Sequence, residues 1–266
     1  MRDLQTILMS GAIKTIGKLS TGIANSFEHG FTSGQQMEYI YDNKAHGRFI
    51  IGKLIDRVFL NNVGWRGVRN RKDNLKKLIT TIITNNRGKG VVTTIHDLAS
   101  GSGRYLFEAL SEVGEDKVLI KCQDINDASI KYGQQKAKTF GFKNIQFVKG
   151  NAFDQVINPE VSSRPNVIVA AGFYDWITDD ELIKKSIAKA YAMLEKGGVF
   201  IFTNLAGHKQ LDLVANAFVD FNQQPLIMKL RDPVLINKWA QNVGFKILDV
   251  IVDQWGFYSI TLGSKE

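Results

Sequence analysis

Two acidic residues placed around a glycine-rich turn are the part of this sequence best suited to bind a ligand. The segment Thr93–Arg104 has the pattern of a buried strand ending at Asp97, then a turn with two glycines, then a helix start. A second short strand, Val118–Gln123, leads to Asp124, 27 residues after Asp97. Glycines let a backbone approach a ligand closely, and the first N–H groups of a helix are unpaired. The arrangement predicts half of a site for an adenosine-containing cofactor, with Asp124 accepting hydrogen bonds from both ribose hydroxyls.

The spacing of the glycines favours one such cofactor over another. A dinucleotide site needs the pattern G-x-G-x-x-G, but Leu106 stands where its third glycine would be. The sequence instead has Asp97-x-Ala99-x-Gly101-x-Gly103, which differs from the acid-x-G-x-G-x-G pattern of S-adenosylmethionine sites by one alanine. S-adenosylmethionine has no pyrophosphate and does not need the third glycine. We therefore predict S-adenosylmethionine as the cofactor, with an ordinary tight turn as the alternative.

Composition narrows the class of protein. The chain has 266 residues, 44% of them hydrophobic, enough for one good core and an additional lobe. No apolar run approaches the roughly 18 residues that span a membrane, and Lys14 and Lys18 interrupt the apolar start, unlike a signal peptide. The single cysteine, Cys122, excludes an intramolecular disulfide, and the four histidines lack zinc-site spacing. We expect a cytoplasmic, metal-free protein.

Positive charge is concentrated in the first third of the chain. The formal net charge is +8; residues 1–90 contain 15 Lys and Arg against 6 Asp and Glu, and residues 91–266 contain 19 against 20. Such asymmetry is typical of proteins that bind RNA, DNA or anionic lipid. An ordinary solvated helical face is the alternative.

Residues 91–266 alternate between predicted strands and helices, which is typical of a doubly wound parallel sheet. Two final strands joined by a tight turn make the last strand antiparallel, as in a methyltransferase sheet. The predicted fold class is therefore α/β, with a mostly parallel seven-stranded sheet. After the first two strands, the expected strands are Ile145–Val148, Val167–Ala171, Val199–Thr203, Lys246–Asp253 and Phe257–Leu262.

Residues 1–90 have the pattern of a helical lobe. Apolar residues recur at helical spacing from Leu4 to Ile23, and the segments Phe49–Leu60 and Leu75–Ile83 are predicted to be helices. We expect 1–90 to form a helical lid or substrate lobe and 91–266 the cofactor-binding domain. A packing face is the commoner meaning of the first stripe, and a helix on a membrane surface is the alternative.

Short segments along the chain together form a recognisable pattern. They are Gly30–Gly34, Tyr39–Asn43, Gly52–Arg57, Gly64–Lys72, Gly103–Tyr105, Gly150–Asp154, Gly172–Asp175, His208–Asp212 and Trp255-Gly256. In this order they resemble one family of class I S-adenosylmethionine-dependent methyltransferases, some of whose members follow an α/β-hydrolase domain in one polypeptide. The resemblance runs from about Gly22 to the C-terminus, and none of the 266 residues matches the hydrolase domain. The chain departs from the family at Asn151, where Asp is usual, and around His208, where the family has proline.

The cofactor hypothesis gives individual residues expected roles. Asp97 would hold the amino group of the methionine part, and Ile125 would lie against the adenine. Arg69 and Arg71 are candidates for the methionine carboxylate, because a guanidinium binds a carboxylate through two parallel hydrogen bonds. Further cofactor contacts are expected from Ala99, Gly101, Gly103 and Arg104 at the turn, from Asn151, Ala152 and Phe153 around the adenine, from Gly172 and Phe173 under the methionine chain, and from Tyr41 and Asn43 of the helical lobe.

Methyl transfer needs an aligned nucleophile and, for some acceptors, a base. His208, Tyr174 and Asp175 follow predicted strands at the edge where substrates bind in such folds, and they are the catalytic candidates. Ordinary loop and packing roles are the alternative for all three. The predicted function is methyl transfer to a small-molecule or lipid-like acceptor, the alternative is RNA methylation through the basic lobe, and homodimer formation is left open.

Overall fold

The computed structural model describes residues 4–153, 164–208, 210–220, 222–224 and 226–266 and divides into two compact units. Unit 1 comprises residues 1–69 and 208–228, and unit 2 comprises residues 70–207 and 229–266. Asp154 and Lys209, which belong to two of the family-like segments, lie outside the described residues.

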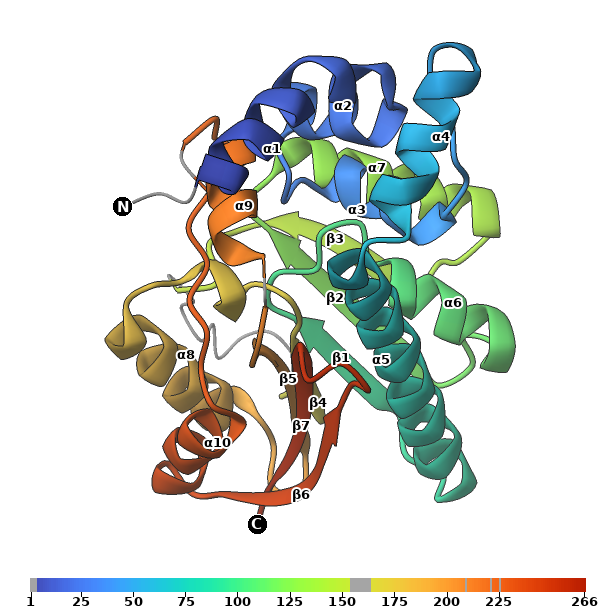
Figure 1. Cartoon of the computed structure of the whole chain (residues 1–266). Coiled ribbons are helices and arrows are strands. Elements are labelled where there is room, and N and C mark those ends of the chain that lie inside the picture. The colour runs from blue at the N-terminus through green and yellow to red at the C-terminus, as the bar shows by residue number, and fades with distance from the viewer. Residues whose placement is uncertain (1–3, 154–163, 209, 221, 225) are drawn as a thin grey trace. The chain divides into compact units, whose positions relative to one another are not determined.

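Unit 2 contains a seven-stranded sheet in the order β3-β2-β1-β4-β5-β7-β6 (Figure 1). The first five strands pair in parallel, and β7 runs antiparallel to both of its neighbours. This confirms the predicted fold class. The strands are β1 (Thr93–Asp97), β2 (Val118–Asp124), β3 (Ile145–Lys149), β4 (Val167–Ala170), β5 (Val199–Leu205), β6 (Phe245–Val252) and β7 (Tyr258–Lys265).

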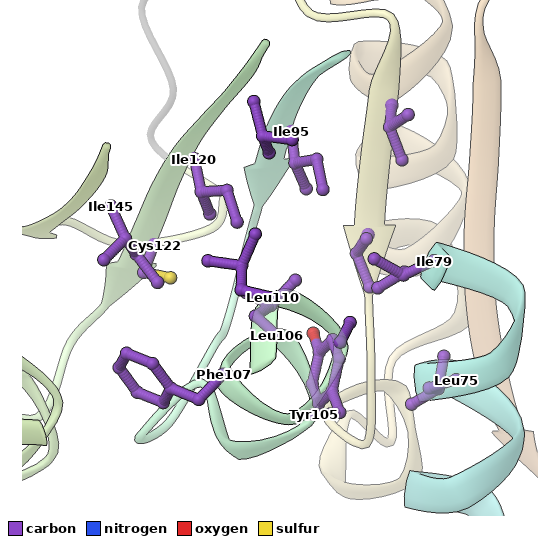
Figure 2. Close-up of a cluster of buried hydrophobic side chains, with 14 of the residues drawn as sticks. Leu75, Ile79, Ile95, Tyr105, Leu106, Phe107, Leu110, Ile120, Cys122 and Ile145 are labelled. Atoms are coloured by element: carbon purple, nitrogen blue, oxygen red, sulfur yellow. The ribbon is translucent and has the colours of Figure 1, made fainter. Parts of the chain in front are cut away.

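Helices cover both faces of this sheet, and two apolar cores lie between them and the strands. In β4, Val167 and Val169 belong to one core while Ile168 and Ala170 belong to the other, as alternation along a strand requires. Figure 2 shows Leu75 and Ile79 of α5 in the first core. The helices that line the first core are α5 (Val63–Gly88), α6 (Arg104–Val113) and α7 (Asp127–Phe140). The second core is lined by α8 (Asp180–Met193), α10 (Pro233–Asn242) and the 3-10 turn η2 (Tyr174–Trp176).

Unit 1 is helical and includes a segment from late in the chain. Ser10 donates a hydrogen bond to the carbonyl of Asn216 at 3.0 Å, and the ring of Phe218 contacts those of Phe27 and Phe31. The 208–228 segment therefore packs with the N-terminal helices. They are α1 (Leu4–Lys14), η1 (Ile16–Leu19), α2 (Thr21–His29), α3 (Gly34–Asp42), α4 (Phe49–Leu60) and the first turns of α5, joined by α9 (Leu211–Ala217).

The structure adds detail at two helices, α5 and α8. The family-like segment Gly64–Lys72 is helical and continues into the predicted helix Leu75–Ile83, so that both belong to α5. Because the later turns of α5 pack into the sheet core, the units divide within α5 rather than at residue 90. The N-cap residue of α8 is Asp179, whose carboxylate accepts from the N–H of Glu181.

Candidate active site

The turn after β1 is held over the end of β2 by backbone hydrogen bonds. The N–H of Leu98 donates to the carbonyl of Val169 at 2.9 Å, and that of Ser100 donates to Gln123 at 2.9 Å. Gly101 and Gly103 then adopt positive φ angles of 55° and 73°, which side chains rarely tolerate. These contacts fix the turn at the carboxyl edge of the sheet, between β2 and β4, the two neighbours of β1.

Ala99 and Arg104 flank these glycines. Ala99 replaces glycine without strain, because its φ angle is not positive. Gly103 occupies the N-cap position of α6, which begins at Arg104. The Arg104 guanidinium pairs with Glu108 one turn along α6 at 2.8 Å, so part of its hydrogen-bonding capacity serves the helix.

Asp97 is a buried carboxyl with spare capacity to accept hydrogen bonds. Its Oδ2 accepts a short hydrogen bond from the hydroxyl of Tyr105, and its Oδ1 has no partner among the described residues. Burial raises the pKa of Asp97 to about 7, and the Asp124 carboxyl adds to this rise. The Tyr105 hydroxyl and the Ala99 N–H oppose it. An unpartnered buried carboxyl oxygen is costly, so this atom is a candidate contact for a ligand.

Asp124 links the glycine turn after β1 to the residues that follow β2. Its Oδ2 accepts from the N–H of Gly101 at 2.7 Å, and its Oδ1 accepts from the N–H of Asn126 at 2.8 Å. Burial raises its pKa, and these backbone donors act in the opposite direction. A carboxylate offers about four acceptor positions, so Asp124 can still accept from two further donors. Ile125, beside it, is 54% exposed.

Asn151, Ala152 and Phe153 follow β3 along the same edge. Asn151 Oδ1 accepts from the N–H of Phe153 at 3.0 Å, so the side chain stabilises its own turn. Ala152 is buried in the second core, and the Phe153 ring lies 5.6 Å from that of Phe173. Asn151 and Phe153 are partly exposed at this edge, whereas Ala152 contributes through packing.

Arg71, Gly172 and Asp175 form a second cluster, at the end of β4. Gly172 has a φ angle of 77°, and a Cβ there would lie 2.8 Å from Arg71 Nη2. Arg71 Nη1 lies 2.9 Å from Asp175 Oδ2, and its guanidinium lies 4.4 Å from the ring centre of Tyr258. The carboxyl is fully enclosed: burial raises the pKa of Asp175, the Arg71 charge opposes the rise, and Oδ1 has no partner among the described residues.

The two aromatic residues after Gly172 differ in their surroundings. Phe173 is half-buried, between Phe153 and Tyr174. Tyr174 is fully buried in the second core, and its hydroxyl shares a hydrogen bond of 2.9 Å with Ser186. This environment favours a packing role for Tyr174 over contact with a substrate.

His208 belongs to unit 1, where it meets Gly64. A Cβ at Gly64 would lie 3.0 Å from His208 Nε2, so the absence of a side chain there makes room for the imidazole. His208 Nδ1 accepts from the N–H of Gln210 at 3.1 Å, and burial lowers the pKa of His208. The neutral ring therefore carries its proton on Nε2, and it can take up a second proton only if the hydrogen bond from Gln210 breaks.

Arg69, Tyr41 and Asn43 also lie in unit 1. The Arg69 guanidinium donates to the carbonyl of Leu60 at 2.9 Å and to that of Ile40 at 3.4 Å, so it ties α3 and α4 to α5. Asn43 ends α3 in a left-handed conformation with φ of 50°, and Tyr41 lies half-buried within α3. The structure thus places Arg71 beside the strand ends of unit 2 and commits Arg69 to backbone carbonyls within unit 1.

The sequence matches the model of a family described as "Putative methyltransferase" over residues 1–265. The chain belongs to this methyltransferase family. Its seven-stranded sheet with β7 reversed is the sheet predicted for a class I methyltransferase. The match confirms the resemblance that the short segments indicated.

A curated relative and several solved structures are similar to this chain. The uncharacterized protein YnbC of Escherichia coli K12 is 29% identical over 99% of the chain, which spans only 45% of that relative's length. A protein described as "possible exported protein" from Bordetella parapertussis has a TM-score of 0.70 at 12% identity, covering 98% of this chain and 86% of that one.

Two solved methyltransferases share the fold. The magnesium protoporphyrin IX methyltransferase of Synechocystis, with bound S-adenosylhomocysteine, has a TM-score of 0.59 at 10% identity, covering 90% of this chain and 98% of that one. An O-methyltransferase family protein from Burkholderia thailandensis has a TM-score of 0.54 at 14% identity, covering 79% and 62%. Within the described residues, the chain has no helix with the length and apolar character needed to cross a bilayer.

The cofactor that this family and fold imply is S-adenosylmethionine, as the glycine spacing predicted. Two features of unit 2 fit it. The unpartnered Oδ1 of Asp97 can accept from an ammonium group, and Asp124 can accept from paired hydroxyls. In addition, no described atom lies within 4 Å of a Cβ built on Gly101, so the turn leaves open space beside its backbone.

Sequence reasoning missed three residues that organise these regions. Tyr105 orients Asp97, and it could have been recognised because it lies in the family-like segment Gly103–Tyr105. Asp56 of unit 1 accepts four hydrogen bonds, and it also lies in a family-like segment. Arg231 is buried beside η2, where it donates to the carbonyls of Tyr174 and Ile177; no local pattern signals this role.

Proposed function

We propose that this methyltransferase transfers a methyl group from S-adenosylmethionine to an oxygen atom of a small-molecule or lipid-related acceptor. The observation that carries the cofactor part is the pair of acids, buried Asp97 and partly buried Asp124, which meet at the glycine turn with acceptor capacity left over. The oxygen acceptor is supported by solved structures of the same fold that are named O-methyltransferases.

Each residue of the turn would have a defined task in binding. Asp124 would accept from the ribose hydroxyls, and Ile125 would cover one face of the adenine. Asp97 Oδ1 would accept from the ammonium group of the methionine part, and ionised Asp97 would be stabilised by that charge. Arg71 is the candidate for the methionine carboxylate, since its guanidinium lies beside Gly172 at the end of β4.

Bound S-adenosylmethionine supplies a methyl group already activated on a sulfonium. The chain's remaining task is to hold the acceptor oxygen about 3 Å from that methyl carbon, in line with the sulfur. Asp175 is the first candidate for accepting the acceptor's proton, and His208 could do so only after its hydrogen bond from the N–H of Gln210 breaks. Asp175 has an unpartnered Oδ1 among the described residues and a pKa raised by burial, which makes it a stronger base once ionised.

A transfer assay with S-adenosylmethionine labelled in its methyl group tests the proposal. The purified chain is incubated with phenols, carboxylic acids, hydroxylated lipids, amines and structured RNA, and the labelled product and S-adenosylhomocysteine are both measured. We expect label in one or more oxygen acceptors, and a loss of turnover in Asp124→Ala at limiting cofactor. Label confined to amines or to RNA would contradict the proposed acceptor class.

A further inference from the structure

Helix α4 presents an apolar stripe to solvent. Phe49 is 83% exposed, Ile50 is 80% exposed and Val58 is 75% exposed, and Ile51 and Leu54 are also exposed. Positions 50, 54 and 58 recur every four residues, so their side chains lie along one face of the helix. Scattered exposed apolar residues are ordinary, but five within the twelve residues of one helix are a concentration of exposed apolar side chains.

The opposite face of α4 is already used. Gly52, Asp56 and Leu60 are buried, and they also recur every four residues. A Cβ on Gly52 would lie 2.3 Å from the carbonyl oxygen of Leu19, so α4 packs closely against η1 on this side. The apolar stripe is therefore an addition to the packing face rather than a poorly buried part of it.

Four positively charged residues lie before and within the stripe. Lys44, Arg48, Lys53 and Arg57 are exposed, and none of the four makes an ion pair with any residue that the structure describes. The one acid between residues 44 and 58 is Asp56, which is buried and fully hydrogen-bonded. This segment thus exposes apolar and cationic side chains only.

The backbone at the start of the stripe is unusual. Phe49 has a φ angle of 58°, in the left-handed region that bulky side chains avoid. The strained conformation holds an aromatic ring in water at the N-terminal end of α4. Strain of this kind tends to occur where a surface binds something.

We propose that the α4 surface, defined as Lys44, Arg48, Phe49–Ile51, Lys53, Leu54, Arg57 and Val58, docks on an anionic lipid bilayer. Apolar side chains on one helix face enter the boundary between headgroups and acyl chains, and flanking cations pair with anionic headgroups. Charge complementarity favours this occupant over a second copy of the chain, because two copies would bring eight like charges together. The inference goes beyond methyl transfer and does not depend on it.

Sedimentation of the full chain with vesicles tests the inference. One set of vesicles is pure phosphatidylcholine, and the other contains phosphatidylglycerol as well. We expect binding to the anionic set and little to the neutral set, with a marked loss at high salt because salt screens exposed charges. No binding to either set, or equal binding to both, would overturn the proposal without the use of any variant.

Paired variants separate the two components of the surface. Lys53→Glu/Arg57→Glu should weaken binding at least about twentyfold, because each cation near an anionic surface contributes about fivefold. Ile50→Ser/Val58→Ser should weaken it at least about tenfold. The matched controls are Lys131→Glu/Lys138→Glu in α7 and Val234→Ser, which is 74% exposed in α10; both should bind like the parent chain.

Two parallel measurements separate bilayer docking from misfolding and from self-association. Binding of S-adenosylhomocysteine should be the same in the α4 variants and the parent, which shows intact folding and separates this inference from the proposed function. Sedimentation velocity without vesicles should give a single species unaffected by Ile50→Ser/Val58→Ser. A dimer that this variant dissociates would instead identify a second copy as the occupant and contradict the proposal.

Discussion

Unit 1 and unit 2 each bury an aspartate where several segments meet, but the two carboxyls differ in how fully they are hydrogen-bonded. Asp56 of unit 1 accepts from Ser20 Oγ at 2.6 Å, from the N–H of Gly22 at 2.7 Å, from the N–H of His46 at 2.9 Å and from the Tyr39 hydroxyl. Asp97 of unit 2 accepts from the Tyr105 hydroxyl and keeps Oδ1 without a partner among the described residues.

The difference separates a structural acid from a binding acid. Four donors use all the acceptor positions of the Asp56 carboxylate, so it has nothing left to offer a ligand. Asp97 has been removed from water without equivalent compensation, and its pKa rises to about 7 as a result. The incompletely hydrogen-bonded carboxyl of Asp97 therefore lowers the stability of unit 2, and a bound ammonium group would supply the missing interaction.

Among the substitutions that test this comparison, the one at Asp56 should have the largest effect. Asp56→Ala leaves two backbone N–H groups and two hydroxyls without their acceptor, so it should lower the free energy of unfolding by about 4 kcal/mol or more. Denaturant unfolding followed by circular dichroism measures it. Glu28→Ala, at an exposed acid in the same unit, should change stability by less than about 0.5 kcal/mol. Equal effects from both variants would show that Asp56 is not the organising residue.

Asp97→Asn should raise the free energy of unfolding, whereas Asp56→Ala lowers it. Because folding raises the pKa of Asp97 from 3.8 to about 7, the folded state holds an extra proton between these values, and stability falls as pH rises through that range. The side-chain amide of asparagine does not ionise, so the variant does not lose stability in this way. We expect Asp97→Asn to stabilise the cofactor-free chain by about 2–4 kcal/mol at pH 8 and to have little effect at pH 4. A variant that is less stable than the parent at pH 8 would contradict the raised pKa.

At Asp124 the expected loss is in cofactor binding. Asp124→Ala removes the acceptor for two ribose hydroxyls, and hydrogen bonds to a charged group are worth about 1.5–3 kcal/mol each. Affinity for S-adenosylhomocysteine should fall at least tenfold by calorimetry. The matched control is Asp127→Ala, three residues further on, where an exposed carboxylate pairs with Lys149. Similar losses in both variants would point to general damage of this loop.

The smallest effect on stability is expected at Arg69. It tests whether Arg69 has a structural role while Arg71 is the candidate for the methionine carboxylate. Arg69→Ala removes two hydrogen bonds to backbone carbonyls of unit 1, so stability should fall by about 1–2 kcal/mol while affinity for S-adenosylhomocysteine is unchanged. The sequence-based hypothesis, in which Arg69 binds the methionine carboxylate, predicts weaker S-adenosylhomocysteine binding and unchanged adenosine binding. Calorimetry with both ligands distinguishes the two.

The sequence was informative wherever the signal is local. Strand ends, glycine turns and acids lie close together in the chain, so β1, the turn and Asp124 could be identified from their spacing. The reversal of the last strand was also predicted, because its tight turn at Trp255-Gly256 is local.

Other features depend on partners distant in sequence and could not be predicted. Arg71 pairs with Asp175, 104 residues away, and the glycine that admits its guanidinium is Gly172. Gly64 lies within helix α5, and its lack of a side chain makes room for His208, which is also distant in sequence. Asp56 likewise reveals its role only when its four donors are assembled.

The central claim is that Asp97 is left incompletely hydrogen-bonded in order to bind the ammonium group of the cofactor. Calorimetry of S-adenosylhomocysteine binding between pH 5 and pH 9, in buffers of different ionisation enthalpy, tests it directly. Binding should select ionised Asp97, so affinity should fall by up to about tenfold per unit as pH drops below 7, with proton release near that pH. In Asp97→Asn both the pH dependence and the proton release should disappear and affinity should be lower. Equal affinity and equal proton release in parent and variant would contradict the account.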